Sequence, residues 1–216
     1  MRGLLIKDFR LLKGQTKFFV IIFIMTIFLS LNSSDNFAIT YLTFICGFLA
    51  ISAVGYDDNG NGMPFLLTLP VSRSLYVREK YVFGALITAI GWAAGVVITG
   101  VIGLVKGNPL PADELIFNLV WLLLWLMTMS LSLPAVLKYG TEKGKIALLA
   151  SILVLVAAVY VASRFFEQMG YDIDAVIEGF SALDTLGIVA LLSVLAIVML
   201  VVSCAIATGI VRRKEY

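Results

Sequence analysis

The sequence has no histidine and only two cysteines, and charged residues make up 14% of it against 61% hydrophobic residues. Without histidine, the chain lacks the commonest metal ligand and the commonest general base near neutral pH. Cys46 and Cys204 both lie in apolar stretches, where they are expected to be small packing residues rather than disulfide partners. Soluble domains carry about 25% charged residues, so this composition predicts a membrane protein.

Charge is missing altogether from six long stretches of the chain. A helix needs about 20 apolar residues to cross the hydrocarbon core, and shorter stretches of about 17 are tolerated. We therefore predict an all-α membrane protein with a single transmembrane domain over residues 1–216. The predicted spans are about 18–34, 36–56, 81–105, 115–137, 146–163 and 185–211.

The charges between these stretches alternate in sign along the chain. If the N-terminus lies inside, the inner segments hold 14 of the 16 Lys and Arg residues and carry a net charge of +8, while the outer segments carry −6. Because Lys and Arg are retained on the cytosolic side during insertion, this asymmetry predicts both termini inside. The positive charge is divided among four membrane-flanking segments, so it does not indicate a nucleic-acid partner.

None of the predicted spans contains Asp, Glu, Lys, Arg or His. Ion-coupled transporters and intramembrane proteases usually need such groups at membrane depth. We therefore predict that the chain is not an enzyme, binds no cofactor or metal itself, and takes any energy for uphill transport from another protein.

The first 17 residues predict a helix that lies flat at the membrane surface. Lys7, Arg10, Lys13 and Lys17 fall on one side of a helical wheel, while the apolar side includes Phe9 and four leucines. Such a helix places its apolar side among lipid acyl chains and its cations at the headgroups. The alternative is a generic basic flank that only sets the topology.

Residues 57–80 form the most distinctive cytosolic segment. A flexible Asp/Asn/Gly opening is followed by a short apolar run between Pro64 and Pro70, and Ser72 is placed to cap the next helix. An apolar patch facing the cytosol suggests partner docking. It could equally lie on the membrane or against the protein's own spans. The predicted patch residues are Phe65, Leu66, Leu67 and Leu69, and we expect Met63, which precedes Pro64, to act with them in coupling.

Two further segments carry packing or surface signals. In the third span, Gly91 and Gly95 form a small-xxx-small pattern that lets helices approach closely. In the external segment 164–184, acidic residues alternate with aromatic and aliphatic ones. This segment is either a short amphipathic helix or a solvated loop.

The run Phe65-Leu66-Leu67-Thr68-Leu69-Pro70-Val71-Ser72-Arg73, followed by Tyr76-Val77 and Lys80-Tyr81, resembles the signature after the second span of ABC-2 type transporter permeases. Six spans with both ends inside are similar to that family along the whole chain. The resemblance implies a bacterial cytoplasmic membrane protein that forms a dimer, with each copy docked on a separate ATPase subunit that holds ATP and Mg²⁺. The family's coupling helix maps onto about residues 62–69.

Small members of this family resemble exporters of amphipathic peptides, such as the phenol-soluble modulin exporter of Gram-positive bacteria. The resemblance therefore implies a peptide export permease, with coupling through the patch residues and with Arg73 contacting an acidic group of the ATPase. Spans 1 and 5 would form the dimer seam, and spans 1, 2 and 5 would line the path. An alternative from a different class is a non-transporting membrane scaffold or immunity protein that sequesters a peptide and needs no ATPase.

Overall fold

The computed structural model describes residues 1–32, 36–58, 72–108, 110–140, 146, 149–157, 160–161, 164 and 185–213. These residues are almost entirely helical, and they contain no strand, which confirms the predicted all-α class. The main elements are α1 (Arg2–Lys13), α2 (Thr16–Asn32), α3 (Phe37–Asp58), α5 (Arg73–Lys106), α6 (Ala112–Tyr139) and α9 (Thr185–Arg213).

Four helices in the described part of the chain are long and apolar enough to cross a membrane, namely α3, α5, α6 and α9. A fifth candidate arises if α1 and α2, which meet at an angle of 67°, are counted as one broken span. The predicted fifth span, 146–163, lies partly outside the described residues. Four to five candidate spans therefore stand where the sequence predicts six, and the orientation stays a prediction.

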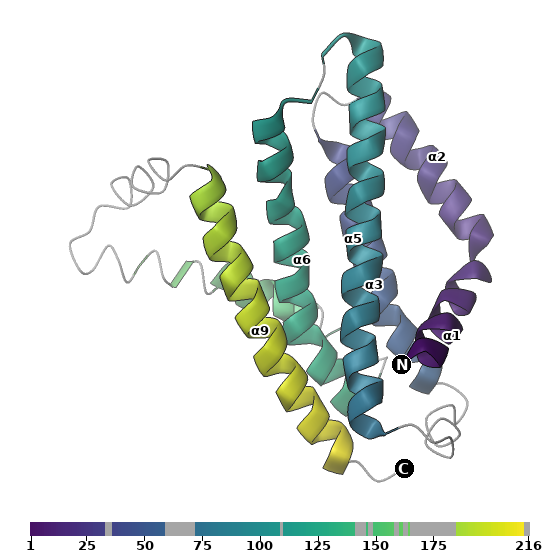
Figure 1. The fold of residues 1–216 in the computed structure, drawn as a ribbon, viewed down its shortest axis with the longest axis vertical. Helices are drawn as coiled ribbons and strands as arrows, with labels where there is room; N and C mark the ends of the chain where they lie inside the picture. The colour runs from purple at the N-terminus through teal and green to yellow at the C-terminus, as the bar shows by residue number, and fades with distance from the viewer. Residues whose placement is uncertain are drawn as a thin grey trace.

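The bundle is built from two helix pairs. The most extensive contacts join α3 to α5 and α6 to α9, and further contacts from α3 to α6 and from α5 to α9 join the pairs. Figure 1 shows α1 and α2 on the flank of the bundle away from α9, with α2 slanting outward. The contacts of α2 are with α3 and α5, and α1 contacts α5.

The N-terminus, the end of α3, the start of α5 and the end of α9 gather at the lower end of the view in Figure 1. We call this the terminal end of the bundle. Ser72 caps α5 here as the sequence predicts, since its side chain accepts a hydrogen bond from the Leu75 amide at 3.2 Å. At 34 residues, α5 is about 50 Å long, well beyond the roughly 30 Å of hydrocarbon. Its first turns therefore belong to the protein–water boundary.

The close packing of α3 on α5 depends on glycine. A methyl group at Gly95 would lie 2.5 Å from the Ile39 Cα atom, and one at Gly91 would lie 2.8 Å from the Leu42 carbonyl oxygen. Both neighbours are backbone atoms of α3, which no side-chain rotation can move away. The small-xxx-small pattern thus marks the place where α3 crosses α5 at short range.

Hydroxyl groups link α5 to the other helix pair. Tyr81 on α5 and Ser203 on α9 share a hydrogen bond, and the Ser203 hydroxyl donates to the Ser130 carbonyl of α6. Because Ser203 gives its proton to α6, the Tyr81 hydroxyl is the donor to Ser203. This chain ties three helices together within an otherwise apolar core, where unpaired hydroxyls would be costly.

We predict that Gly95→Ala weakens the α3–α5 contact by about 1–3 kcal/mol, because the added methyl group overpacks against backbone. Gly100→Ala on the same helix is the matched control, since nothing lies within 4 Å of its added methyl group. Thermal unfolding of the purified proteins in detergent measures the stability of both variants. A control as destabilised as Gly95→Ala would show that the helix, rather than the contact, is sensitive.

Candidate functional site

Five charged side chains from three helices meet at the terminal end of the bundle. Lys7 and Asp8 come from α1, Asp57 from the last turn of α3, and Glu79 and Lys80 from the second turn of α5. We call these five residues the charge cluster. Asp57 lies two residues before the 59–71 segment and α5 follows it, so the cluster joins the two helix ends on either side of the predicted coupling segment.

Lys80 is the centre of the charge cluster. Its ammonium group bonds the Asp8 carboxylate, lies 2.7 Å from Asp57 Oδ2 and lies 3.9 Å from Glu79 Oε2. Only 1% of the Lys80 side chain is exposed, and Asp8 and Glu79 are fully buried. A buried ammonium is tolerable only when carboxylates of this kind surround it. Lys80 therefore holds α1, α3 and α5 together.

Two further side chains, Lys7 and Tyr76, hold the Asp57 carboxylate in place. Lys7 bonds Asp57 Oδ1 and also lies 3.1 Å from Asp8 Oδ1, with 30% of its side chain exposed. The Tyr76 hydroxyl donates to Asp57 Oδ2 at 3.2 Å, and the Lys80 ammonium lies 5.4 Å from the centre of the Tyr76 ring. Asp57 is thus held by donors from α1 and α5 together.

The N-terminal helix differs in detail from its predicted arrangement. Its buried face is Leu4, Asp8 and Leu12, and Leu4 and Leu12 pack in two different protein clusters. Lys7, expected at lipid headgroups, is paired with Asp57, and the Phe9 ring meets the Phe83 ring of α5 edge-on at 5.4 Å. Sequence reasoning missed Asp8. Its i, i+4, i+8 spacing with Leu4 and Leu12 is the signal that could have found it.

The other predicted residues at this end divide into two groups. Arg10, Lys13 and Lys17 are exposed, so they are available for headgroups. Met63, Phe65, Leu66, Leu67 and Leu69 lie outside the described residues, as does the external segment apart from Arg164. Their roles stay predictions.

Arg73 has an intramolecular role that the sequence did not predict. Its guanidinium donates to the carbonyl oxygens of Val211 at 3.2 Å and Arg212 at 2.9 Å. These carbonyls belong to the last turn of α9, where the helix dipole favours a positive charge. The start of α5 is thereby fastened to the end of α9. Whether Arg73 also meets an ATPase is not tested by these contacts.

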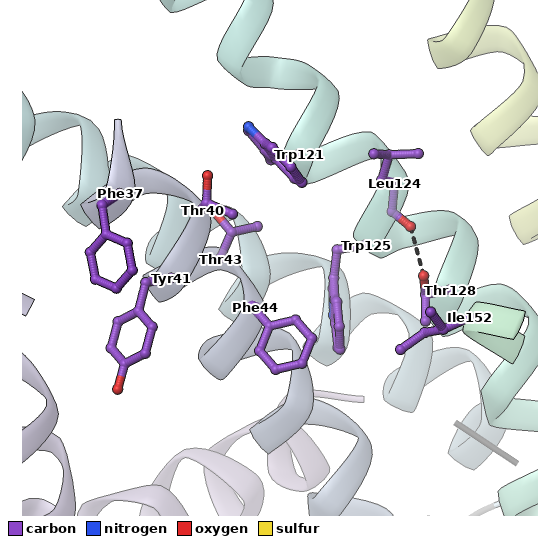
Figure 2. A pocket seen from close by; sticks show the side chains of 10 residues that line it. All are labelled: Phe37, Thr40, Tyr41, Thr43, Phe44, Trp121, Leu124, Trp125, Thr128 and Ile152. Atoms are coloured by element: carbon purple, nitrogen blue, oxygen red, sulfur yellow. Dashed lines mark hydrogen bonds between the residues drawn. The ribbon is translucent and has the colours of Figure 1, made fainter. Parts of the chain in front are cut away.

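An aromatic cavity of about 430 Å³ lies between α3 and α6. Figure 2 shows α3 and α6 supplying the labelled side chains around it, together with Ile152. Four of the five aromatic side chains lie in two pairs: Phe37 stacks on Tyr41 at 5.2 Å, and Phe44 meets Trp125 edge-on at 5.0 Å. The full lining is Phe37, Thr40, Tyr41, Thr43, Phe44, Trp121, Leu124, Trp125, Thr128 and Ile152.

The cavity is chemically apolar despite its threonines. The Thr43 hydroxyl donates to the Ile39 carbonyl at 2.6 Å and the Thr128 hydroxyl to the Leu124 carbonyl at 2.9 Å, so both donors are used within their own helices. The cavity therefore suits an aromatic or aliphatic group. The predicted path took its lining from spans 1, 2 and 5, whereas this cavity uses spans 2 and 4 with one residue of span 5.

No group of metal-ligating side chains that could hold an ion occurs in the described part of the chain. The three carboxyl groups of the charge cluster face lysine ammonium groups instead. Among the described residues, the charge cluster can hold helices together and the aromatic cavity can accept apolar ligands.

Comparison with known proteins gives one match. A family model described as ABC-2 family transporter protein matches residues 3–212, which is nearly the whole chain. No curated protein and no solved structure matches the chain.

We predict that Lys80→Met destabilises the folded protein by about 3–5 kcal/mol, because it leaves three buried carboxyl groups without their central cation. Lys138→Met is the control, since Lys138 is exposed on α6. Thermal unfolding and the yield of monodisperse protein in detergent are the measurements. A wild-type-like Lys80→Met protein would contradict the central place of Lys80.

Proposed function

Because the chain belongs to the ABC-2 family of transporter proteins, we propose that it is the permease subunit of an exporter that moves amphipathic or hydrophobic peptides out of the cell. Membership makes it a membrane component of an ABC transporter, which is consistent with its not being an enzyme itself. The family match over residues 3–212 is the observation that carries the proposal. The substrate class rests on the apolar cavity and on the resemblance to small peptide exporters.

The energy would come from partner subunits. Permeases of this family generally pair with ABC ATPases. We infer two such ATPases, each holding ATP and Mg²⁺, on a dimer of this chain in the bacterial cytoplasmic membrane. In the single chain, α2 leaves a broad apolar surface uncovered, with Ile24 62% and Phe28 65% exposed. Lipid or the second copy would cover it.

The charge cluster suggests how movement would pass from the ATPase to the membrane. Segment 62–69 is the proposed docking helix, with Met63, Phe65, Leu66, Leu67 and Leu69 facing the ATPase. Its two ends continue into α3 and α5, which the cluster and the Gly91–Gly95 contact make one rigid pair. A displacement of the docking helix would therefore move α3 and α5 together, changing the cavity wall that α3 forms.

Loss of the apolar patch should separate the permease from its ATPase. We expect the double variant Phe65→Asp/Leu67→Asp to lose co-purification in mild detergent with the ABC ATPase encoded beside it, because charges replace the docking surface. The matched control is Phe65→Tyr/Leu67→Met, which keeps the surface apolar. If the wild type captures no ATPase, the exporter proposal loses its energy source, and the scaffold or immunity alternative takes its place.

Removing part of the aromatic surface of the cavity should weaken the binding of a peptide substrate. We expect Trp121→Ala to reduce, by about tenfold or more, the affinity with which an amphipathic helical peptide stimulates ATPase activity of the reconstituted complex, because an aromatic anchor is lost. Phe117→Ala is the control, one turn away on α6 and 57% exposed but not in the cavity lining. Equal effects of the two variants would argue against the cavity as the peptide site.

A further inference from the structure

The charge cluster is not electrically balanced. It contains two lysines and three carboxyl groups, so full ionisation leaves one negative charge in excess. Glu79 has no exposed surface, and burying an uncompensated charge is costly enough that such a group usually becomes neutral instead. The excess charge therefore needs a counterpart.

Three oxygen atoms show where that counterpart belongs. Both Glu79 carboxyl oxygens are buried and have no hydrogen-bond partner among the described residues, and Asp8 Oδ1 is buried with only the ion-pair contact to the Lys7 ammonium at 3.1 Å. The Asp8 and Glu79 carboxyl groups are neighbours, because both face the Lys80 ammonium group, which bonds Asp8 and lies 3.9 Å from Glu79 Oε2. Two ionised carboxylates offer only acceptors, so they cannot bond one another. A proton between them converts one acceptor into a donor and satisfies both groups.

Among the described residues, the surroundings of Glu79 offer no other source of compensation. Lys80 on its own helix lies 3.9 Å away and is already bonded to Asp8 and Asp57, and Lys7 is bonded to Asp57 and lies 3.1 Å from Asp8 Oδ1. Arg73 donates to carbonyl oxygens of α9. The other described charged side chains of α5 and of the helices packed on it at this end are exposed, namely Arg10, Lys13, Lys17, Arg78, Lys138, Arg212 and Arg213. A water molecule could donate to these oxygens, but it would leave the charge in place.

We propose that the charge cluster is a proton-binding site, in which Asp8 of α1 and Glu79 of α5 share one proton and make the cluster neutral. Losing the proton would leave two carboxylates in repulsion across the contact between α1 and α5. The bound proton would thus hold α1 against the α3–α5 pair at low pH. Its loss at high pH would weaken that contact. Any effect of this on transport rests on the proposed function, but the proton site itself does not.

The sign of the pH effect follows from proton counting. At neutral pH an unfolded chain has released its carboxyl protons, whereas the folded cluster retains one. Stability must therefore fall as the pH rises through the range in which the folded site loses its proton. Glutamine at position 79 is the uncharged equivalent of the protonated acid, since its amide can donate to Asp8 at every pH.

The first experiment measures the proton directly. Infrared spectra of the purified full-length protein in lipid nanodiscs at about pH 6, where free carboxyl groups are ionised but burial keeps Glu79 protonated by raising its pKa to about 7, should show the C=O band of a buried carboxylic acid. This band should disappear in both Glu79→Gln and Asp8→Asn, and it should persist in the control Glu114→Gln, whose side chain is exposed. Absence of the band in the wild type overturns the proposal in favour of a bound cation or a basic side chain. Its persistence in Asp8→Asn overturns the sharing.

The second experiment follows the consequence for α1. The melting temperature of the wild type should fall between about pH 5 and about pH 8 relative to Glu79→Gln, whose profile should be flatter, because burial raises the pKa of Glu79 to about 7 in the folded protein. Parallel profiles for the two proteins would overturn the proposal. Neither measurement involves an ATPase or a peptide, so failure of the exporter proposal would leave both results unaffected.

Discussion

Burial of the Lys80 ammonium group is the constraint on which the terminal end of the bundle depends. An ammonium with 1% of its side chain exposed requires carboxylates at close range, and here they come from α1 and α3, two helices distant in the sequence from α5. A shift of α3 along α5 would separate Asp57 from Lys80. The cluster therefore sets the position of α3 along α5. The glycine contact at Gly91 and Gly95 sets the same position independently, further along the pair.

This double restraint divides the bundle into parts with different freedom. The α3–α5 pair is held by charges and backbone contact, whereas α2 and α9 expose long apolar faces that lipid or a second copy must cover. The aromatic cavity begins at Phe44, about 20 Å along α3 from Asp57. A single helix, α3, therefore runs from the charge cluster to the cavity wall.

The sequence predicted several local features correctly because each has a short-range cause. The all-α class follows from the uncharged stretches, the start of α5 at Arg73 follows from the Ser72 cap, and the close approach of α5 follows from the glycine spacing. The number of spans agreed less well. The 17-residue α2 lies at the short limit for a span, and it is a candidate span only together with α1, from which it is bent by 67°. Hydropathy counts apolar residues, and it carries no information on the angle between consecutive helices.

The sequence did not predict which charged residues lie together in the folded chain. Because the predicted spans contain no ionisable groups, the sequence predicts no ion-coupling or catalytic site at membrane depth. It indicates Asp8, Asp57, Glu79 and Lys80 only as charges that flank the spans. In the folded chain they are buried in one cluster. Residues 8, 57 and 80 are too far apart in the chain for any periodic pattern to connect them, and pairing of this kind is decided only when helices pack.

By itself, the sequence determined that this chain is a helical membrane protein and where the long apolar helices α3, α5, α6 and α9 lie along it. Those properties depend on composition and on spacing along the chain. The tertiary structure decided which carboxyl groups surround Lys80, that Arg73 fastens α5 to α9, and that α3 and α6 enclose an aromatic cavity. Each of these depends on distances between helices, and such distances arise only from packing.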